Sequence, residues 1–227
     1  TNNDTAYESA ISLINKGIKV EAIIDIREKS DSSIVKEAEN LGLKIFWSHT
    51  VVDTHGYKKL KKISLMKLSK DGQSIIGAKT KIDCDCLGIA GGWTPAVHLF
   101  TQSGGKLKFR DEDQVFIPNK YPSKQISIGS CNGDFELDEI IKNISKSLKE
   151  FLEIDQTDYE NLSVVNSKET DKKNIWLLPS DKVIGKTKPF VDYQNDATAK
   201  DIKLALREGF KSIEHVKRYT TTGMGTD

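Results

Sequence analysis

The sequence predicts an α/β fold, with a nucleotide-binding type of domain followed by a small α+β module. Three observations support this prediction. Strand and helix patterns alternate over about residues 1–92, an antiparallel hairpin pattern lies within this stretch, and a short unit with two helix patterns ends the chain. Alternating strands and helices with short connections are typical of a parallel sheet with right-handed crossovers.

The alternation consists of a helix, a strand, a helix and a strand, at residues 6–16, 20–26, 32–41 and 44–52. Both helix patterns carry apolar residues at helical spacing, and Gly17 and Gly42 stand where the helices would end. Asp4 or Thr5 is placed to cap the first helix. The first strand is a continuous run rich in β-branched residues, which indicates burial on both faces.

Residues 61–68 and 74–81 alternate between apolar and polar side chains around Lys70-Asp71-Gly72, which predicts an antiparallel hairpin. Residues 86–90 read as a further short apolar strand that ends in Gly91-Gly92. A parallel sheet combined with such a hairpin is typical of the nucleotide-binding domains of flavin-type reductases.

The pattern is irregular over residues 100–124, and residues 126–128 then predict a short strand. A long helix pattern covers residues 137–151, with its apolar side chains on one face. Residues 155–188 are polar and charged, which indicates a linker, with one strand at residues 175–178.

The last unit begins at Phe190 and contains two helix patterns. Thr198 and Asp201 have the spacing of a capping box, and Gly209 stands where the first helix would end. Residues 213–219 form the second helix pattern, which leads into three consecutive threonines.

Composition and cysteine usage exclude several classes of protein. Lys and Arg number 34 and Asp and Glu number 33, so no excess charge points to nucleic acid or to an anionic membrane. The apolar runs are too short to span a bilayer, and no signal-peptide pattern follows Thr1. Three cysteines, Cys84, Cys86 and Cys131, are too few for a disulfide framework, so we expect a reducing cytoplasm and no metal site.

Two turns that precede helices are candidates for binding a nucleotide. The first, residues 1–5, stands where a dinucleotide-binding domain has Gly-x-Gly-x-x-Gly, and it lacks the glycines that let the backbone approach a pyrophosphate. Asp4 would repel a phosphate, whereas Asp25 is placed to accept a hydrogen bond from a ribose. A nucleotide site and a Rossmann-like domain without a nucleotide are both compatible with these residues.

The second turn lies at residues 129–133, before the long helix pattern. Backbone N–H groups that converge at such a helix start attract an anion. A nucleotide would lie over Gly129, Ser130 and Gly133, with Phe135 or Leu137 packed against it. Two-domain flavin reductases usually have an acidic residue after the first glycine, where this chain has Ser130, and the alternative is a helix cap without a ligand.

Four segments resemble the alpha subunits of heterotetrameric sarcosine oxidases, namely residues 1–7, 90–106, 190–198 and 209–227. The resemblance extends over the whole chain and implies an internal fragment. It implies a Rossmann-like nested domain within a reductase fold that has two dinucleotide-binding domains. The resemblance implies three parts. Residues 1–154 would form a reductase-like domain, with the nested portion at about residues 1–92 and the return to the outer domain at about residues 93–154. Residues 155–188 would form a linker, and residues 189–227 a truncated module.

The resemblance also implies cofactors, partners and a reaction. The alpha subunit would bind NAD, FMN would lie between the alpha and beta subunits, and the beta subunit would carry FAD. With gamma and delta subunits the complex would demethylate sarcosine oxidatively to glycine, pass the one-carbon unit to tetrahydrofolate and form hydrogen peroxide. The outer domain's glycine loop would lie upstream of Thr1 and a folate domain would follow Asp227. The NAD contacts of this chain would come from Gly129, Ser130, Gly133, Phe135 and Leu137.

The module at residues 189–227 also resembles the [2Fe–2S] module of bacterioferritin-associated ferredoxins, without its cysteines. Asp192 and Gln194 stand at the first cysteine pair and Asp227 at the third cysteine, so we expect no iron–sulfur cluster. Cations and hydroxyls near that place suit a phosphate or the edge of FMN at a subunit interface, the alternative being a solvated basic helix end. These side chains belong to Lys217, Arg218, Thr220, Thr221 and Thr222.

No catalytic residue is expected in this chain. His49, His98 and His215 have no Ser, Cys or carboxylate partner at a meaningful spacing. Catalysis would then belong to partner subunits and cofactors, with this chain providing binding and orientation. Two further hypotheses stay open: a non-catalytic assembly module with a vestigial nucleotide site, and the alpha subunit of a related opine or glycine oxidase complex, against which the missing cysteines count.

Overall fold

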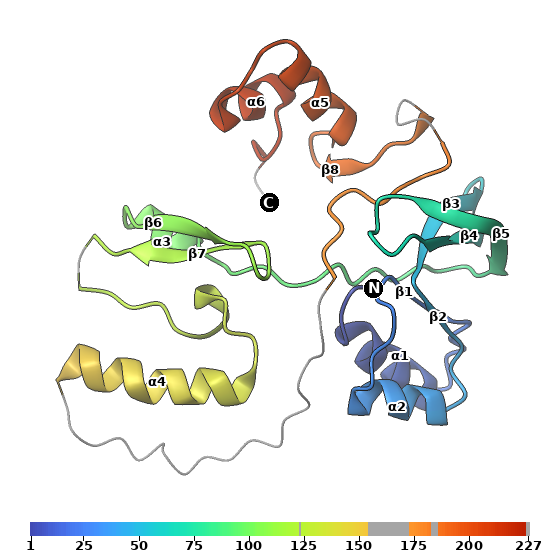
Figure 1. Cartoon of the computed structure of the whole chain (residues 1–227), viewed down its shortest axis with the longest axis horizontal. Coiled ribbons are helices and arrows are strands. Elements are labelled where there is room, and N and C mark those ends of the chain that lie inside the picture. Colours follow the sequence, from blue (N-terminus) through green and yellow to red (C-terminus); the bar gives the residue numbers. More distant parts are fainter. Residues whose placement is uncertain (123, 154–172, 183–185, 226–227) are drawn as a thin grey trace. The chain divides into compact units, whose positions relative to one another are not determined.

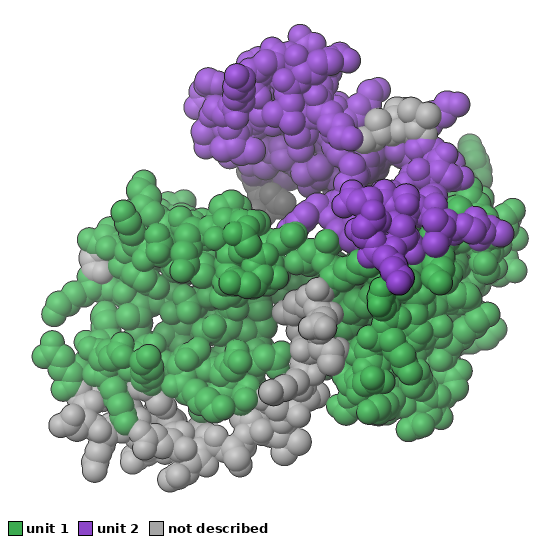
Figure 2. Space-filling view, in the orientation of Figure 1, with its two compact units in different colours: residues 1–67, 79–174 green, residues 68–78, 175–227 purple. Residues whose placement is uncertain are grey.

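The computed structural model describes residues 1–122, 124–153, 173–182 and 186–225. The chain divides into two compact units, which Figure 2 distinguishes by colour. The first unit comprises Thr1–Lys67 and Lys79–Asn174, and the second comprises Leu68–Ala78 and Ile175–Asp227. Both units contain helices and strands, which confirms the predicted α/β class.

The first unit starts with the predicted order of helix, strand, helix and strand (Figure 1), formed by α1 (Thr5–Asn15), β1 (Ile23–Asp25), α2 (Ser33–Asn40) and β2 (Ile45–Trp47). The two strands are parallel, with Ile23 opposite Ile45. Thr1 adds a parallel pairing on the other edge of β1, because its backbone nitrogen donates to the Ile24 carbonyl and its carbonyl accepts from the Ile26 N–H. The carboxyl ends of these paired segments therefore meet at one edge.

One apolar core joins α1, α2 and β1. Its buried members are Tyr7, Ala10, Ile11, Ile23, Val35, Ala38 and Leu43. Tyr7 and Val35 have no exposed surface, and each large apolar side chain buried in this way contributes about 1.5–3 kcal/mol relative to exposure. The predicted helix periodicities agree with these buried faces at Ala10, Val35 and Ala38, whereas Leu13 and Leu41, at the same spacing, are exposed.

The strand predicted over residues 44–52 is two strands in the structure. Ser48 has a left-handed φ of 54°, which turns the chain out of the parallel pair. The next strand, β3 (His49–Gly56), instead pairs antiparallel with β4 (Leu60–Leu68). β5 (Ile75–Asp83) completes a three-stranded sheet in the order β3-β4-β5, which confirms the predicted hairpin.

Residues 100–124 are more regular than predicted. They contain most of α3 (His98–Gln102) and an antiparallel hairpin of β6 (Lys106–Arg110) and β7 (Val115–Lys120). The hairpin was not predicted because Gly, Lys and Pro residues interrupt this stretch, although Leu107 and Phe109 alternate with basic residues in β6. The strand predicted at residues 126–128 is wrong, since these residues lead directly into the 3₁₀ turn η1 (Gly129–Asn132) and then into the predicted helix, α4 (Leu137–Leu152).

The second unit ends in two short strands and two helices, at β8 (Phe190–Asp192), β9 (Ala197–Thr198), α5 (Ala199–Arg207) and α6 (Ile213–Thr220). The capping box is confirmed, because the Asp201 carboxylate accepts from the backbone N–H of Thr198 at 2.8 Å and from its hydroxyl at 2.6 Å. α5 and α6 pack together around the buried Ala205 and Val216. Both helices were predicted at these places.

Two further predicted strands are wrong. Residues 86–90 and 175–178 are not assigned to strands, and they expose large side chains such as Ile89 and Trp176. Short apolar runs without a neighbouring strand cannot complete a ladder of backbone hydrogen bonds. Of the predicted linker, residues 155–172 and 183–185 lie outside the described residues, as does Asp227. None of the helices that the structure describes has both the length and the apolar character needed to cross a bilayer.

Candidate functional site

The first candidate turn, residues 1–5, is held together by side-chain amides. Asn2 and Asn3 are buried, and the Asn3 side chain donates to the side-chain oxygen of Asn2 at 2.7 Å. The Asn3 side-chain oxygen accepts from the backbone N–H of Thr5 at 2.9 Å, so it satisfies a donor at the start of α1. Asp4 occupies the N-cap position, but its side chain does not cap the helix. The turn thus satisfies its own backbone in place of a bound phosphate.

A buried ionic cluster lies beside this turn. The Arg27 guanidinium lies 2.8 Å from an Asp4 carboxylate oxygen and 2.8 Å from Asp25, and the side chains of Arg27, Asp4 and Asp25 are 5%, 11% and 0% exposed. Arg27 also donates its backbone N–H to Asp25 at 2.9 Å, and the Tyr7 hydroxyl donates to Asp25 at 2.9 Å. Burial, and then the adjacent Asp25 carboxylate, raise the pKa of the Tyr7 hydroxyl, which stays protonated as a donor.

These contacts change the interpretation of Asp25. Its two oxygens accept from the backbone, Nε and Nη2 of Arg27 and from Tyr7, and no part of the residue is exposed. The interpretation of Asp25 as a ribose acceptor is therefore wrong, because the protein's own donors already occupy the carboxylate. Arg27 was not among the predicted site residues, although an arginine two residues after an acid at the end of a buried strand is a signal for such a pair.

The second candidate turn is compact and partly accessible. Gly129 is buried with a left-handed φ of 77°, and a Cβ there would lie 3.6 Å from the Ile140 side chain of α4. Ser130 is exposed, and Leu137 at the start of α4 is 54% exposed. Gly133 closes the turn with a φ of 86°, and Phe135 is half-buried. The structure thus brings the five predicted residues together at the start of one helix, with Ser130 and Leu137 on the accessible side.

In the C-terminal module, Asp192 connects two loops. Its carboxylate accepts from the backbone N–H groups of Gln194 at 2.9 Å and Asn195 at 3.1 Å, and from the Asn195 side chain at 2.9 Å. A fourth bond, from the backbone N–H of Gly223 at 2.7 Å, comes from the loop after α6. The Asn195 side chain first, and then the Gly223 N–H, lower the pKa of Asp192 to about 2. A carboxylate therefore holds together the loops where the resemblance puts cluster ligands.

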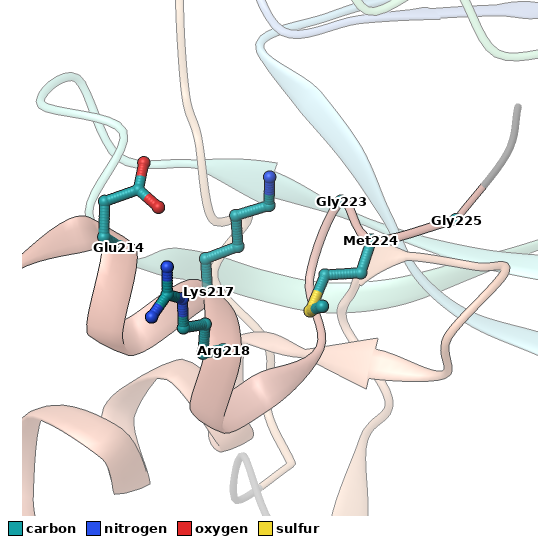
Figure 3. Close-up of a pocket in the computed structure, with 6 residues that line it drawn as sticks. All are labelled: Glu214, Lys217, Arg218, Gly223, Met224 and Gly225. Carbon is teal, nitrogen blue, oxygen red and sulfur yellow. The ribbon is translucent and has the colours of Figure 1, made fainter.

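The predicted flavin-proximal residues lie at the end of α6. Lys217 and Arg218 extend from the helix, together with Glu214, beside an open hollow of about 380 Å³ that Met224 also lines (Figure 3). The lining combines the two cations with the Glu214 carboxylate, the apolar Met224 and two glycines, so positive charge exceeds negative charge by one at this surface. Lys217 and Arg218 are exposed at this surface.

The three predicted threonines are largely engaged with one another and with the helix end. The Thr220 hydroxyl donates to the Val216 carbonyl at 2.8 Å and lies 2.7 Å from the Thr222 hydroxyl. Thr221 ends α6 with a left-handed φ of 59°, and its hydroxyl donates to the Thr220 carbonyl at 2.6 Å. The threonines shape the loop, and the cations provide its charge.

A Ser–His pair appears on adjacent strands that the sequence analysis did not pair. The Nε2 atom of His55 lies 2.7 Å from the Ser64 hydroxyl, but Ser64 has no exposed surface. Because a buried hydroxyl cannot reach a substrate, we interpret the pair as a packing contact between β3 and β4. Within the described residues, no group of three or more His, Cys, Asp or Glu side chains could hold a metal ion.

Comparisons with known proteins show that this chain is similar to sarcosine oxidase alpha subunits. Residues 186–227 match the family model of the sarcosine oxidase A3 domain. Over its whole length the chain is 30% identical to the sarcosine oxidase subunit alpha of Corynebacterium sp. (strain P-1) and 28% identical to that of Rhizobium meliloti (strain 1021). The resemblance to sarcosine oxidase alpha subunits is confirmed. The chain spans 24% and 22% of the length of these two relatives.

A solved structure supports the fold. The L-proline dehydrogenase from P. horikoshii matches 95% of this chain and 43% of its own chain, with a TM-score of 0.54 and 17% sequence identity. At this identity the similarity concerns the path of the backbone. It agrees with the α/β class of this chain.

Proposed function

We propose that this chain is part of the NAD-binding alpha subunit of a sarcosine oxidase complex. The complex would demethylate sarcosine oxidatively to glycine, transfer the one-carbon unit to tetrahydrofolate and form hydrogen peroxide. The observation that carries this proposal is the similarity along the whole chain to sarcosine oxidase alpha subunits, together with the A3 domain match at residues 186–227. Beta, gamma and delta subunits would be the partners.

The chain's own contribution would be binding and assembly. NAD would contact the turn formed by Gly129, Ser130 and Gly133, with Phe135 and Leu137 beside it. Exposure of Ser130 and Leu137 supports this assignment, because a ligand could reach both without displacing the core. FMN would lie near Lys217 and Arg218, where cations beside an apolar Met224 suit a phosphate-bearing cofactor at an interface. The threonines Thr220, Thr221 and Thr222 would shape that loop, FAD would reside in the beta subunit, and no iron–sulfur cluster would be present.

NAD titration of the assembled complex by calorimetry tests the first assignment. Gly129→Trp should abolish binding, but Gly129 is buried against Ile140, so this variant also strains the start of α4. Ser130→Trp is the cleaner variant, because Ser130 is exposed and its new side chain would cover the turn from outside. Gly91→Trp, at an open position, is the matched control. Unchanged affinity in Ser130→Trp and Gly129→Trp would show that NAD does not use this turn.

Flavin content tests the second assignment. Reversal of charge in Lys217→Glu with Arg218→Glu should lower the FMN retained by the purified complex, whereas Lys203→Glu, an exposed position on α5, should not. Equal FMN content in both variants would contradict the assignment of this surface to FMN. The comparison uses the complex as isolated, so loss of assembly is detected separately by its subunit composition.

A second candidate function has a specific observation in its favour. Arg27 fills the place beside Asp25 where a nested domain could take a ribose, which agrees with an assembly module whose nucleotide site is vestigial. This hypothesis predicts an intact complex that does not bind NAD through this chain. The related opine or glycine oxidase alternative differs in substrate, and turnover of sarcosine against an opine or glycine by the complex distinguishes it.

A further inference from the structure

Arg110 fastens the second candidate turn to the neighbouring hairpin. At the end of β6, its guanidinium is oriented by Asp113, through a 2.8 Å bond from Nε and a second contact from Nη2. The same Nη2 atom donates to the backbone carbonyl of Gly133 at 2.8 Å. A planar guanidinium held by a carboxylate on one side presents its remaining donors in a fixed direction. Arg110 therefore sets the position of the carbonyl that closes the Gly129–Gly133 turn.

The packing around Gly133 leaves no room for a side chain beside Arg110. A Cβ at Gly133 would lie 2.7 Å from Nη2 of Arg110 and 2.9 Å from a methyl group of Ile117 on β7. The turn also closes on itself, because the N–H of Gly133 donates to Ser130 and that of Asp134 donates to Gly129. The backbone of the turn is thus shaped by its own bonds, and the Arg110–Gly133 bond holds it from the side of the hairpin.

Asn174 extends this connection to the first candidate turn. Its side-chain nitrogen donates to the backbone carbonyl of Asp113 at 2.9 Å, and its side-chain oxygen accepts from the Asn2 side chain at 3.3 Å. Asn2 in turn accepts from Asn3, which holds the first N–H of α1. A continuous series of hydrogen bonds therefore joins the turns that precede α1 and α4, although these helices begin more than a hundred residues apart.

We propose that Arg110 and Asn174 are positioning residues that hold the Gly129–Gly133 turn in the form that binds the nucleotide, without touching the ligand themselves. The proposal rests on the proposed function for its ligand. Arg110 acts directly on the Gly133 carbonyl, and Asn174 acts through Asp113, whose backbone it fixes. Loss of either residue should loosen the turn, with the larger effect for Arg110.

Cys131 provides a measurement of the turn that does not depend on NAD. Its thiol lies inside the turn, half-buried, and donates to the Ile128 carbonyl at 3.1 Å. Loss of a hydrogen bond from a charged donor should raise the rate of Cys131 alkylation on the order of tenfold to a hundredfold in Arg110→Met. The rate is read in the assembled complex by mass spectrometry of the peptide that contains Cys131.

Further variants separate the effect of the charge of Arg110 from the effects of its planar guanidinium and of its position on β6. Arg110→Lys keeps the charge but loses the fork, so it should behave like Arg110→Met. Lys108→Met, at an exposed position on the same strand, is the matched control and should leave the alkylation rate unchanged. Asn174→Ala should raise the rate less than Arg110→Met does, and the double variant should show less than the product of the two effects, because both act on one connection.

NAD titration of the same complexes completes the test. The proposal expects weaker NAD binding in the order Arg110→Met, Asn174→Ala and wild type, parallel to Cys131 alkylation. An unchanged Cys131 rate in Arg110→Met and Arg110→Lys would overturn it, whatever the NAD affinity. Faster Cys131 alkylation in Arg110→Met with unchanged NAD affinity would also overturn it. If Ser130→Trp then also binds NAD with wild-type affinity, the proposed NAD site is wrong, and the effect of Arg110 on the turn stands.

Discussion

Replacement of Arg27 should strongly destabilise the part of the first unit that α1, β1 and α2 form. In Arg27→Met the carboxylates of Asp4 and Asp25 stay buried, with side chains 11% and 0% exposed, and lose their cationic partner. Removal of one member of a buried ion pair costs about 3–5 kcal/mol, because the remaining charge is left uncompensated in a region of low polarisability. Tyr7 can donate only one hydrogen bond to Asp25, so it cannot replace the guanidinium.

Hydrogen exchange of backbone amides in α1, β1 and α2 measures this loss locally, within the whole subunit. The matched variant combines Arg27→Met with Asp4→Asn and Asp25→Asn, which removes all three charges and should recover more than half of the loss. Arg207→Met, at a side chain that is 76% exposed, should stay within about 0.5 kcal/mol of the wild type. A cost below about 1 kcal/mol for Arg27→Met, with no recovery in the triple variant, would refute the reasoning from buried charge.

Three further predictions concern single contacts. The pKa of Asp192 is lowered from 3.8 to about 2, so the ionised carboxylate contributes fully to stability above pH 3.8 and this contribution is lost as the pH falls toward 2. Asp192→Asn should therefore remove this pH dependence from the thermal unfolding of the module. Gly133→Ala should destabilise the chain more than Gly17→Ala in thermal unfolding, because both glycines have left-handed φ angles but only Gly133 would bring a Cβ against Arg110. Asp201→Ala should cost about 0.5–2 kcal/mol in urea unfolding through loss of both bonds to Thr198, and equal stability would show that α5 needs no cap.

The sequence predicted elements whose residues carry a local signal. The periodicities of α1, α2, α4, α5 and α6 placed apolar residues on one face, and the spacing of Thr198 and Asp201 placed the start of α5. Strand predictions were wrong where the formation of a strand depends on a neighbouring strand to which it can hydrogen-bond. Ser48 divides one apolar run into strands of two sheets, and the exposed run at residues 86–90 has no ladder to join.

The candidate sites also depend on contacts between segments that are distant in the sequence. The spacing of Asp25 from the first turn suggested a ribose acceptor, but only the folded chain shows that Arg27 already fills the carboxylate. Arg110 carried no signal, because the sequence gives no reason for β6 to meet a turn more than twenty residues later. The two turns themselves were predictable, since a small-residue turn before a helix is a local pattern, whereas the side chains that connect them come from distant segments.

Asp192 and Asp25 are both carboxylates whose oxygens are occupied by hydrogen-bond donors of the protein itself. Each is an acid at a place where a resemblance or a spacing suggested a ligand, and each accepts hydrogen bonds from the protein's own N–H and O–H groups. An acid that is saturated in this way repels a second anion and leaves no donors for it, so neither place suits a phosphate. The donors that could meet an anionic cofactor then lie elsewhere, at the exposed Lys217 and Arg218 and at the turn that Arg110 anchors. Ligand binding by this chain should therefore respond to Ser130 and Lys217 variants.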